Sequence, residues 1–127
     1  METPDGAIAF VAHWIETLNF ATNTGQIDEF KALNDSTCTG CESYEDEIVR
    51  LNGNGAQVRN FKWTGGKSFL TENRQLEVSI ESRDYQVRDD GSDKWSTVKG
   101  AQQELGFTLK WSDHWQVRQL YIPEDAK

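Results

Sequence analysis

The spacing of apolar residues changes once along this chain, and that change constrains the fold more than any other feature. Before Gly55 the spacing is helical, most clearly in the first segment, where the apolar side chains are Ala7, Phe10, Val11, Trp14, Ile15, Leu18 and Ala21. After Gly55 apolar and polar residues alternate, as they do in Leu105–Trp111. Helices followed by alternating strands predict an α+β domain, in which three N-terminal helices pack on one face of an antiparallel sheet of four or more strands.

Local signals set the boundaries of these elements within a single domain that covers residues 1–127. Thr3 is a suitable N-cap, Pro4 fits the first helical position, and Gly25 favours a helix stop. We expect helices over about residues 4–23, 27–34 and 40–52. We expect strands over about residues 57–70, 74–88, 99–111 and 115–122, with a turn over 89–93.

The charge balance excludes several classes of partner. With 21 acidic and 13 basic side chains, the net charge is −8 at neutral pH. Such a chain cannot neutralise the phosphates of a nucleic acid or the headgroups of an anionic membrane. Aromatic residues make up 11% of the chain, and their large rings supply enough buried area to exclude wholesale disorder. No stretch is long and apolar enough for a membrane span, and no signal peptide is visible.

Cys38-Thr39-Gly40-Cys41 is the one short motif that suggests specific chemistry. A structural zinc site needs four ligands, and the histidines, His13 and His114, stand alone, so we expect no metal site. Acidic neighbours disfavour a thiolate, which argues against a redox centre, although free thiols and a redox role stay as alternatives. We favour a structural disulfide between Cys38 and Cys41, because two intervening residues let the sulfurs meet if the turn bends suitably. Disulfides persist in oxidising compartments, so this interpretation favours a location outside the cytoplasm, either anchored at the cell envelope or secreted, with a cytoplasmic location as the alternative.

Candidates for acid–base chemistry are few. Carboxylates on the predicted strands, such as Glu77, alternate away from the apolar face and are expected to point to solvent. The exception is Asp84 beside Tyr85, where the alternation falters and a bulge would turn a polar group inward. The weak catalytic candidates are therefore His13, Asp84 and Tyr85 for proton transfer, with Tyr44 as a hydrogen-bond donor to a developing oxyanion.

The order of elements resembles the nuclear transport factor 2-like superfamily, of the cystatin-like α+β type. Those proteins wrap a curved antiparallel sheet around a long N-terminal helix, so that the resulting cone encloses an apolar cavity. More narrowly, the chain resembles an actinobacterial lipoprotein domain of unknown function over essentially its whole length. The residues that carry this resemblance are Thr3–Ala7, Ala9–Val11, Trp14, Leu18–Ala21, Thr24-Gly25, Leu33–Asp35, Cys38, Cys41, Phe107–Trp111 and Trp115–Val117. It implies a secreted precursor that reaches the membrane only through a lipid anchor, which the sequence itself does not contain.

A cone of this kind predicts a ligand pocket between the first helix and the sheet. The inward residues expected to line it are Phe10, Trp14, Tyr44, Ile80, Phe107, Leu109 and Trp111, although the same rings would serve equally as a filled core. Because the inward faces of the strands carry no acid or base, we expect a non-catalytic cell-envelope domain that binds an apolar small molecule or a protein partner, without a cofactor. The alternatives are a small isomerase, dehydratase or cyclase acting in the cavity, and an interaction module that forms a homodimer through the convex face of the sheet.

Overall fold

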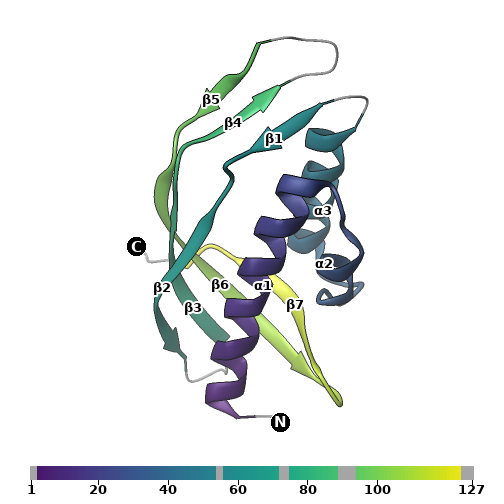
Figure 1. Ribbon diagram of the computed structural model, residues 1–127. Coiled ribbons are helices and arrows are strands. Elements are labelled where there is room, and N and C mark those ends of the chain that lie inside the picture. Colours follow the sequence, from purple (N-terminus) through teal and green to yellow (C-terminus); the bar gives the residue numbers. More distant parts are fainter. Residues whose placement is uncertain (1–2, 54–55, 72–74, 89–93, 124–127) are drawn as a thin grey trace.

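The α+β prediction is confirmed: three helices pack against antiparallel sheets of three and four strands (Figure 1). The computed structural model describes residues 3–53, 56–71, 75–88 and 94–123. The predicted turn over 89–93 lies outside the described residues. The helices are α1 (Pro4–Thr24), α2 (Asp28–Ala32) and α3 (Thr39–Asn52). The strands are β1 (Gln57–Arg59), β2 (Trp63–Leu70), β3 (Gln75–Ser82), β4 (Tyr85–Arg88), β5 (Ser96–Val98), β6 (Ala101–Trp111) and β7 (Trp115–Tyr121).

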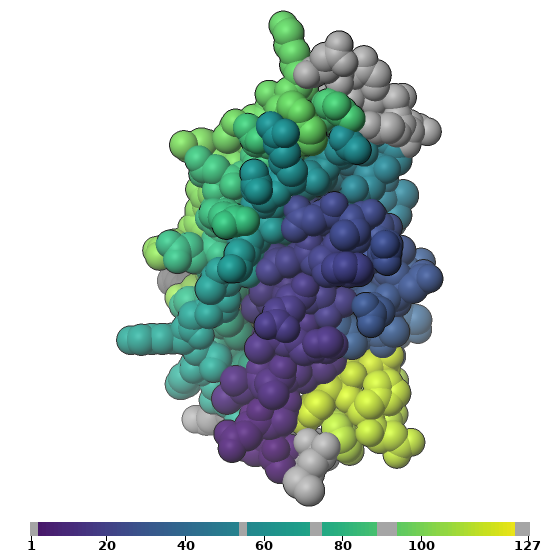
Figure 2. All heavy atoms as spheres, in the orientation of Figure 1, coloured from purple at the N-terminus to yellow at the C-terminus, as the bar shows by residue number. Residues whose placement is uncertain are grey.

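Helix α1 begins and ends where its local signals predict. The Thr3 hydroxyl accepts a hydrogen bond from the Gly6 N–H at 3.0 Å, and Gly25 ends the helix in the left-handed region at φ 80°. Its apolar stripe packs against the sheet, while its outer side forms the surface of that face of the molecule (Figure 2). None of the described helices is long and apolar enough to cross a bilayer.

Two of the four predicted strands are each interrupted once, and a short strand that was not predicted, β5, precedes a third, which produces two sheets instead of one. The predicted strand over 57–70 is divided between β1 and β2 at Asn60, whose positive φ of 65° breaks the extended run. The strand predicted over 74–88 is interrupted at 83–84. The strand predicted over 99–111 begins at Ala101 and is separated from β5 by 99–100, where a Cβ on Gly100 would clash with the backbone of Ser82. The resulting strand orders are β1-β4-β5 and β2-β3-β6-β7. Across Gly65-Gly66, in contrast, β2 continues with only a register shift.

The segment between α2 and α3 protects the edge of the larger sheet. Asn34 forms a parallel bridge to Val117 of β7, with the Asp35 N–H donating to the Val117 carbonyl at 2.8 Å. The Val117 N–H in turn donates to the carbonyl of Leu33 at 2.8 Å. These bonds satisfy backbone groups that an open edge strand would expose. Helix α2 itself is shorter than the predicted 27–34, because the chain leaves the helix to make this pairing.

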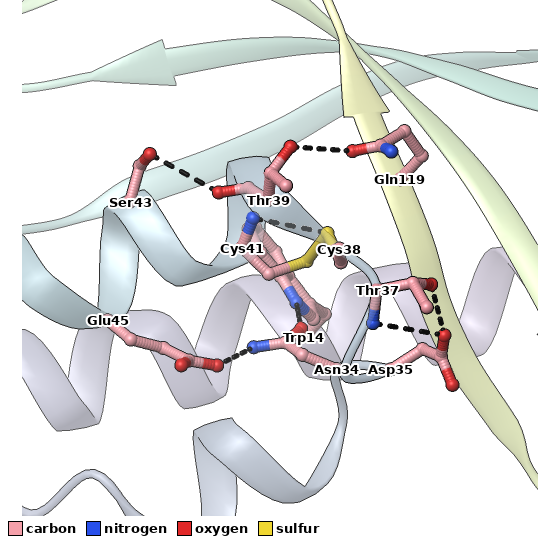
Figure 3. The surroundings of a disulfide bond; sticks show 10 residues. All are labelled: Trp14, Asn34, Asp35, Thr37, Cys38, Thr39, Cys41, Ser43, Glu45 and Gln119. Atoms are coloured by element: carbon pink, nitrogen blue, oxygen red, sulfur yellow. Dashed lines mark hydrogen bonds between the residues drawn. A yellow bond between two sulfur atoms is a disulfide. The ribbon is translucent and has the colours of Figure 1, made fainter.

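The disulfide prediction is confirmed: Cys38 and Cys41 are bonded and buried at the start of α3 (Figure 3). Beside the disulfide lies a polar contact inside the core. The Trp14 indole N–H donates to the Asn34 side-chain oxygen at 2.8 Å, and the Asn34 amide nitrogen donates to Glu45 at 2.9 Å (Figure 3). The contact joins α1, the segment before α3, and α3 itself.

Candidate functional site

The main candidate site is a hollow of about 260 Å³ between α1, α3 and the strands where the two sheets meet. We call it the aromatic pocket, because its walls include four rings, those of Tyr44, Phe61, Trp63 and Tyr85. The other lining residues are Leu18, Thr22, Glu47, Ile48, Leu51, Ser82, Val98, Lys99, Ala101 and Gln103. Helices α1 and α3 therefore supply part of the lining, and the strands with their connecting segments supply the rest.

Two asparagines of α1 hold Phe61 and Trp63 in this wall. The side chain of Asn19 both donates to the carbonyl of Trp63 (3.0 Å) and accepts its N–H (2.9 Å). Asn23, one helical turn later, makes the same pair of bonds to Phe61, at 2.8 and 3.0 Å. The two amides take the place of a neighbouring strand for the backbone between β1 and β2, so these groups are not left unpaired beside the core.

The rings of the aromatic pocket pack mostly edge to face. Tyr44 meets Trp63 with centroids 5.5 Å apart and planes at 89°, and Phe61 meets Tyr85 at 5.0 Å and 81°. The ring centroids of Phe61 and Trp63, one from each pair, lie 6.0 Å apart, so the two pairs are in contact. Behind them, Trp14 contacts Tyr44 at 6.1 Å. Contacts of this kind stabilise by about 0.5–1.5 kcal/mol each beyond area burial, so the wall is built as a continuous packed chain of rings.

The two tyrosine hydroxyls of the aromatic pocket are hydrogen-bond donors at neutral pH. Burial raises the pKa of Tyr44, and burial together with the negative charge of Glu47 raises the pKa of Tyr85. Within the described part of the chain neither hydroxyl has a hydrogen-bond partner, and neither is sealed from solvent. Each is therefore available to a bound molecule.

The charged groups at the rim are already engaged with one another. Glu47 and Arg50 form an ion pair at 2.5 Å, and the hydrogen bonds from the guanidinium lower the pKa of the Glu47 carboxyl. Asp84 accepts the backbone N–H of Gly100 at 2.8 Å and pairs with Lys99 at 3.2 Å, and these contacts lower its pKa. Both carboxylates are therefore ionised and weakly basic at neutral pH.

The structure brings together two of the four catalytic candidates. Tyr44 and Tyr85 line the aromatic pocket, while His13 and Asp84 are exposed and are not among its lining residues. Asp84 lies between β3 and β4 with its carboxylate on the surface. His114 is also exposed, in the turn before β7.

The residues expected to line the pocket do not lie together. Of these seven, Tyr44 lines the aromatic pocket, whereas Trp14 and Phe107 are fully buried and contact each other at 5.1 Å. Phe10 stacks on Trp115, which also meets Trp111, and Leu109 packs against the core. Ile80 is buried and borders a second hollow. Three pocket rings are missing from that expectation: Tyr85, which was named only as a catalytic candidate, Phe61 and Trp63. Phe61 and Trp63 lie two residues apart in the sequence, which is the strand spacing that puts both on one face.

The second hollow is larger, and its lining is more polar than that of the aromatic pocket. Its volume is about 410 Å³, and it lies where β2, β3 and β6 run side by side. Its lining residues are Thr64, Gly65, Gly66, Ser79, Ile80, Glu81, Gln102, Gln103 and Glu104. No group of three metal-ligating side chains occurs among the residues that the structure describes.

A comparison with protein families decides the classification. The model of a family of unknown function, DUF6318, matches residues 1–117. The chain belongs to the DUF6318 family. No curated protein sequence matches this DUF6318 chain.

Solved structures similar to the DUF6318 chain share its fold at low sequence identity. The intermembrane space region of the chloroplast protein ARC6 superposes with a TM-score of 0.70 and 12% identity, over 96% of this chain and 97% of that one. Aln2 from a Streptomyces species gives 0.58 and 14%, over 98% and 94%. A periplasmic fragment of TraM gives 0.54 and 12%, over 94% and 96%. At such identities the likeness shows the fold alone, which is nuclear transport factor 2-like.

Proposed function

We propose that this domain is a non-catalytic binding module that works outside the cytoplasm and holds a small, ring-bearing apolar molecule in the aromatic pocket. One observation carries the proposal: four packed rings line a hollow, and two of them are tyrosines whose hydroxyls have no hydrogen-bond partner in the described part of the chain. An apolar lining with a few convergent polar groups is the usual composition of a small-molecule site.

The size of the aromatic pocket limits the ligand. Its volume of about 260 Å³ lies just below the range of roughly 300–1,000 Å³ that accepts drug-sized molecules. A molecule of one or two fused rings fits this space, whereas a larger polycyclic substrate would require the walls to move apart. An acceptor oxygen on that ring would receive a hydrogen bond from Tyr44 or Tyr85, because both hydroxyls keep their protons at neutral pH.

Binding is favoured over acid–base catalysis by the protonation states at the rim. A general base works best with a pKa near the operating pH, and the pKa of Glu47 is lowered by Arg50 instead of raised. The two tyrosines have raised pKa values and donate hydrogen bonds instead of accepting protons. His13 and Asp84, the other candidates for proton transfer, lie outside the lining of the pocket.

A location in the cell envelope agrees with the covalent structure. The buried Cys38–Cys41 disulfide supports this location, because disulfides form and persist in oxidising compartments. Two proteins with this fold are described as an intermembrane space region and a periplasmic fragment. We propose on this basis, and on the resemblance to lipoprotein domains, that the chain is presented at the outer side of a membrane.

The test uses ring-bearing probes and variants that fill the pocket. We expect 1-naphthol and indole to shift the NMR signals of Trp63, Tyr44 and Tyr85 in the labelled chain, and to leave those of Trp111 unmoved. Leu51→Trp fills the pocket and should abolish these shifts. Val49→Trp is the matched control, because Val49 lies on the same helix with 58% of its surface exposed, and it should bind like the unmodified chain.

A second variant separates the hydroxyl from the ring. Tyr44→Phe keeps the packed ring and removes the hydrogen-bond donor. It should therefore weaken the binding of 1-naphthol, which carries an oxygen acceptor, several-fold more than it weakens the binding of indole. Saturable binding that survives Leu51→Trp, or shifts that cluster away from the aromatic pocket, would contradict the proposal. So would turnover of a ketone substrate that Tyr44→Phe or Tyr85→Phe abolishes, because it would assign the pocket to catalysis.

A further inference from the structure

The outer face of the three-stranded sheet β1-β4-β5 carries a compact basic cluster on an acidic protein. The guanidinium carbon of Arg59 lies 3.8 Å from the centroid of the Trp95 ring, and that of Arg88 lies 5.1 Å from it. We call Arg59, Arg88 and Trp95 the arginine–tryptophan cluster. Their strands place them together, because Arg88 pairs with Gln57 and Arg59 with Gln86 in the register of β1 and β4.

The cluster faces away from the core. Val58 and Val87, which alternate with its arginines along β1 and β4, pack inward against the core. Arg59 and Arg88 consequently point to the opposite side of the sheet, and the side chain of Arg59 is exposed. Because short paired strands carry both arginines, their spacing is set by the sheet.

The hydrogen bonds of the two arginines go to neutral partners. Arg59 Nε donates to the side-chain oxygen of Gln86 at 2.6 Å, and a terminal nitrogen of Arg88 donates to Gln57 at 2.5 Å. Elsewhere in the described chain, Arg50, Lys99 and Lys110 pair with carboxylates. Among the described residues, Arg59 and Arg88 have no carboxylate within ion-pair distance, although the chain contains 21 acidic side chains. Each guanidinium has five N–H donors, so most of these donors have no hydrogen-bond partner among the described residues.

We propose that the arginine–tryptophan cluster is a docking surface for a short acidic segment of a protein partner. A carboxylate matches the planar donor fork of a guanidinium, and stacking on Trp95 holds the two forks in place. The side chains of Gln57 and Gln86 beside the cluster offer further hydrogen bonds to a peptide. The net charge of −8 repels an extended polyanion or an anionic membrane. Salt screens this repulsion beyond about 8 Å, so a short acidic segment bound at the cluster interacts chiefly with the charges of the cluster itself. This surface is separate from the aromatic pocket, and the proposal does not depend on a pocket ligand.

The experiment titrates the ¹⁵N-labelled full chain with a blocked peptide of four Glu-Ser repeats and with its Gln-Ser counterpart. We expect the glutamate peptide to shift the Trp95 indole N–H and the Nε–H signals of both arginines at low salt, with the shifts fading in 300 mM NaCl. The glutamine peptide should leave them unmoved. Equal shifts with the two peptides, or shifts spread over all surface lysines and arginines, would overturn the proposal.

Two double variants with the same change of charge test the location. The double variant Arg59→Gln with Arg88→Gln should bind the glutamate peptide about tenfold more weakly, as expected for the loss of two exposed ion pairs. Lys31→Gln with Arg118→Gln removes two exposed cations elsewhere and should bind like the unmodified chain. Equal weakening by the two pairs would overturn the proposal.

Two further arms complete the test. If the first double variant does not fold, Arg59→Lys with Arg88→Lys keeps the charge and removes the planar forks; it should still weaken the peptide several-fold, and unchanged binding would count against the cluster. Vesicles of phosphatidylglycerol with phosphatidylcholine form the last arm. Sedimentation with these vesicles that the cluster variants abolish, in the absence of peptide binding, would overturn the peptide assignment in favour of a membrane surface.

Discussion

Replacing Asn34 with alanine is expected to lower the free energy of unfolding by about 2–3 kcal/mol. Trp14 is fully buried, and its indole N–H has Asn34 as its partner at 2.8 Å, so the substitution leaves a donor in the core without an acceptor. An orphaned buried donor costs about 1–3 kcal/mol. The bond from Asn34 to Glu45 is partly exposed, and water replaces it on the glutamate, so its loss adds about 0.5–1 kcal/mol. In a domain of this size, the melting temperature should fall by about 10 °C.

A double-mutant cycle isolates the indole bond. Urea unfolding at pH 7, with the disulfide intact and followed by circular dichroism, would give the unfolding free energy of Asn34→Ala, Trp14→Phe and the double variant. Phenylalanine has no N–H, so in the Trp14→Phe background the asparagine substitution should cost only about 1 kcal/mol. The expected coupling energy is therefore about 1–2 kcal/mol. The same loss in both backgrounds would refute the reasoning, because Asn34 would then act through its backbone position or through Glu45 alone.

Three further predictions concern the covalent link and two titrating groups. Cys38→Ala with Cys41→Ala should lower the free energy of unfolding by about 2 kcal/mol or less, because the bond closes a loop with a sequence separation of only 3; complete unfolding of the variant at 25 °C would contradict this. The pKa of Asp35 is lowered to about 2, first by the hydrogen bond from the Thr37 hydroxyl. Because this value lies below that of the unfolded chain, the stabilisation is complete above about pH 4 and is lost as the pH falls to about 2, so Asp35→Asn should flatten the acid limb of a stability–pH curve. Burial and a neighbouring glutamate raise the pKa of Tyr121 to about 12. Its protonated form therefore stabilises the fold below about pH 10, and this stabilisation is lost as the pH rises to about 12. The stability of Tyr121→Phe should consequently depend less on pH over that window. For Asp35 and for Tyr121, an unchanged slope of the stability–pH curve in the variant would count against the assignment.

Several features could be predicted from the sequence, because they depend on local rules of chain geometry. Helix α1 follows from the Thr3 cap, the periodic apolar stripe and the stop at Gly25, all of which act within a few residues. The disulfide joins residues with a separation of 3, so it too is a local feature. The alternation in 101–111 predicts which side chains of β6 face the core, and Leu105 and Phe107 are buried as that pattern requires.

The positions at which the strands are interrupted could be found only from the tertiary structure. Asn60 adopts a positive φ without being a glycine, and nothing in its neighbours along the chain requires this. The backbone there is held from 38 and 44 residues away, by the side chains of Asn23 and Asn19 on α1. Contacts of such separation are absent from any local pattern, because they form only when the helix has docked.

For the candidate site as well, one part of the prediction depends on the local sequence pattern and another on how the elements pack together. Period alone shows that a ring points inward, and it did so for Trp14, Phe107 and Tyr44. Whether an inward ring fills the core or borders a hollow depends on how far apart the opposing elements stand. Trp14 and Phe107 meet across the centre and leave no space, whereas Tyr44 stands where α3 faces the strands across the bend between the two sheets. The sequence therefore determined which side chains are turned inward, and only the packing of α1 and α3 against the bent strands decided which of them line a pocket.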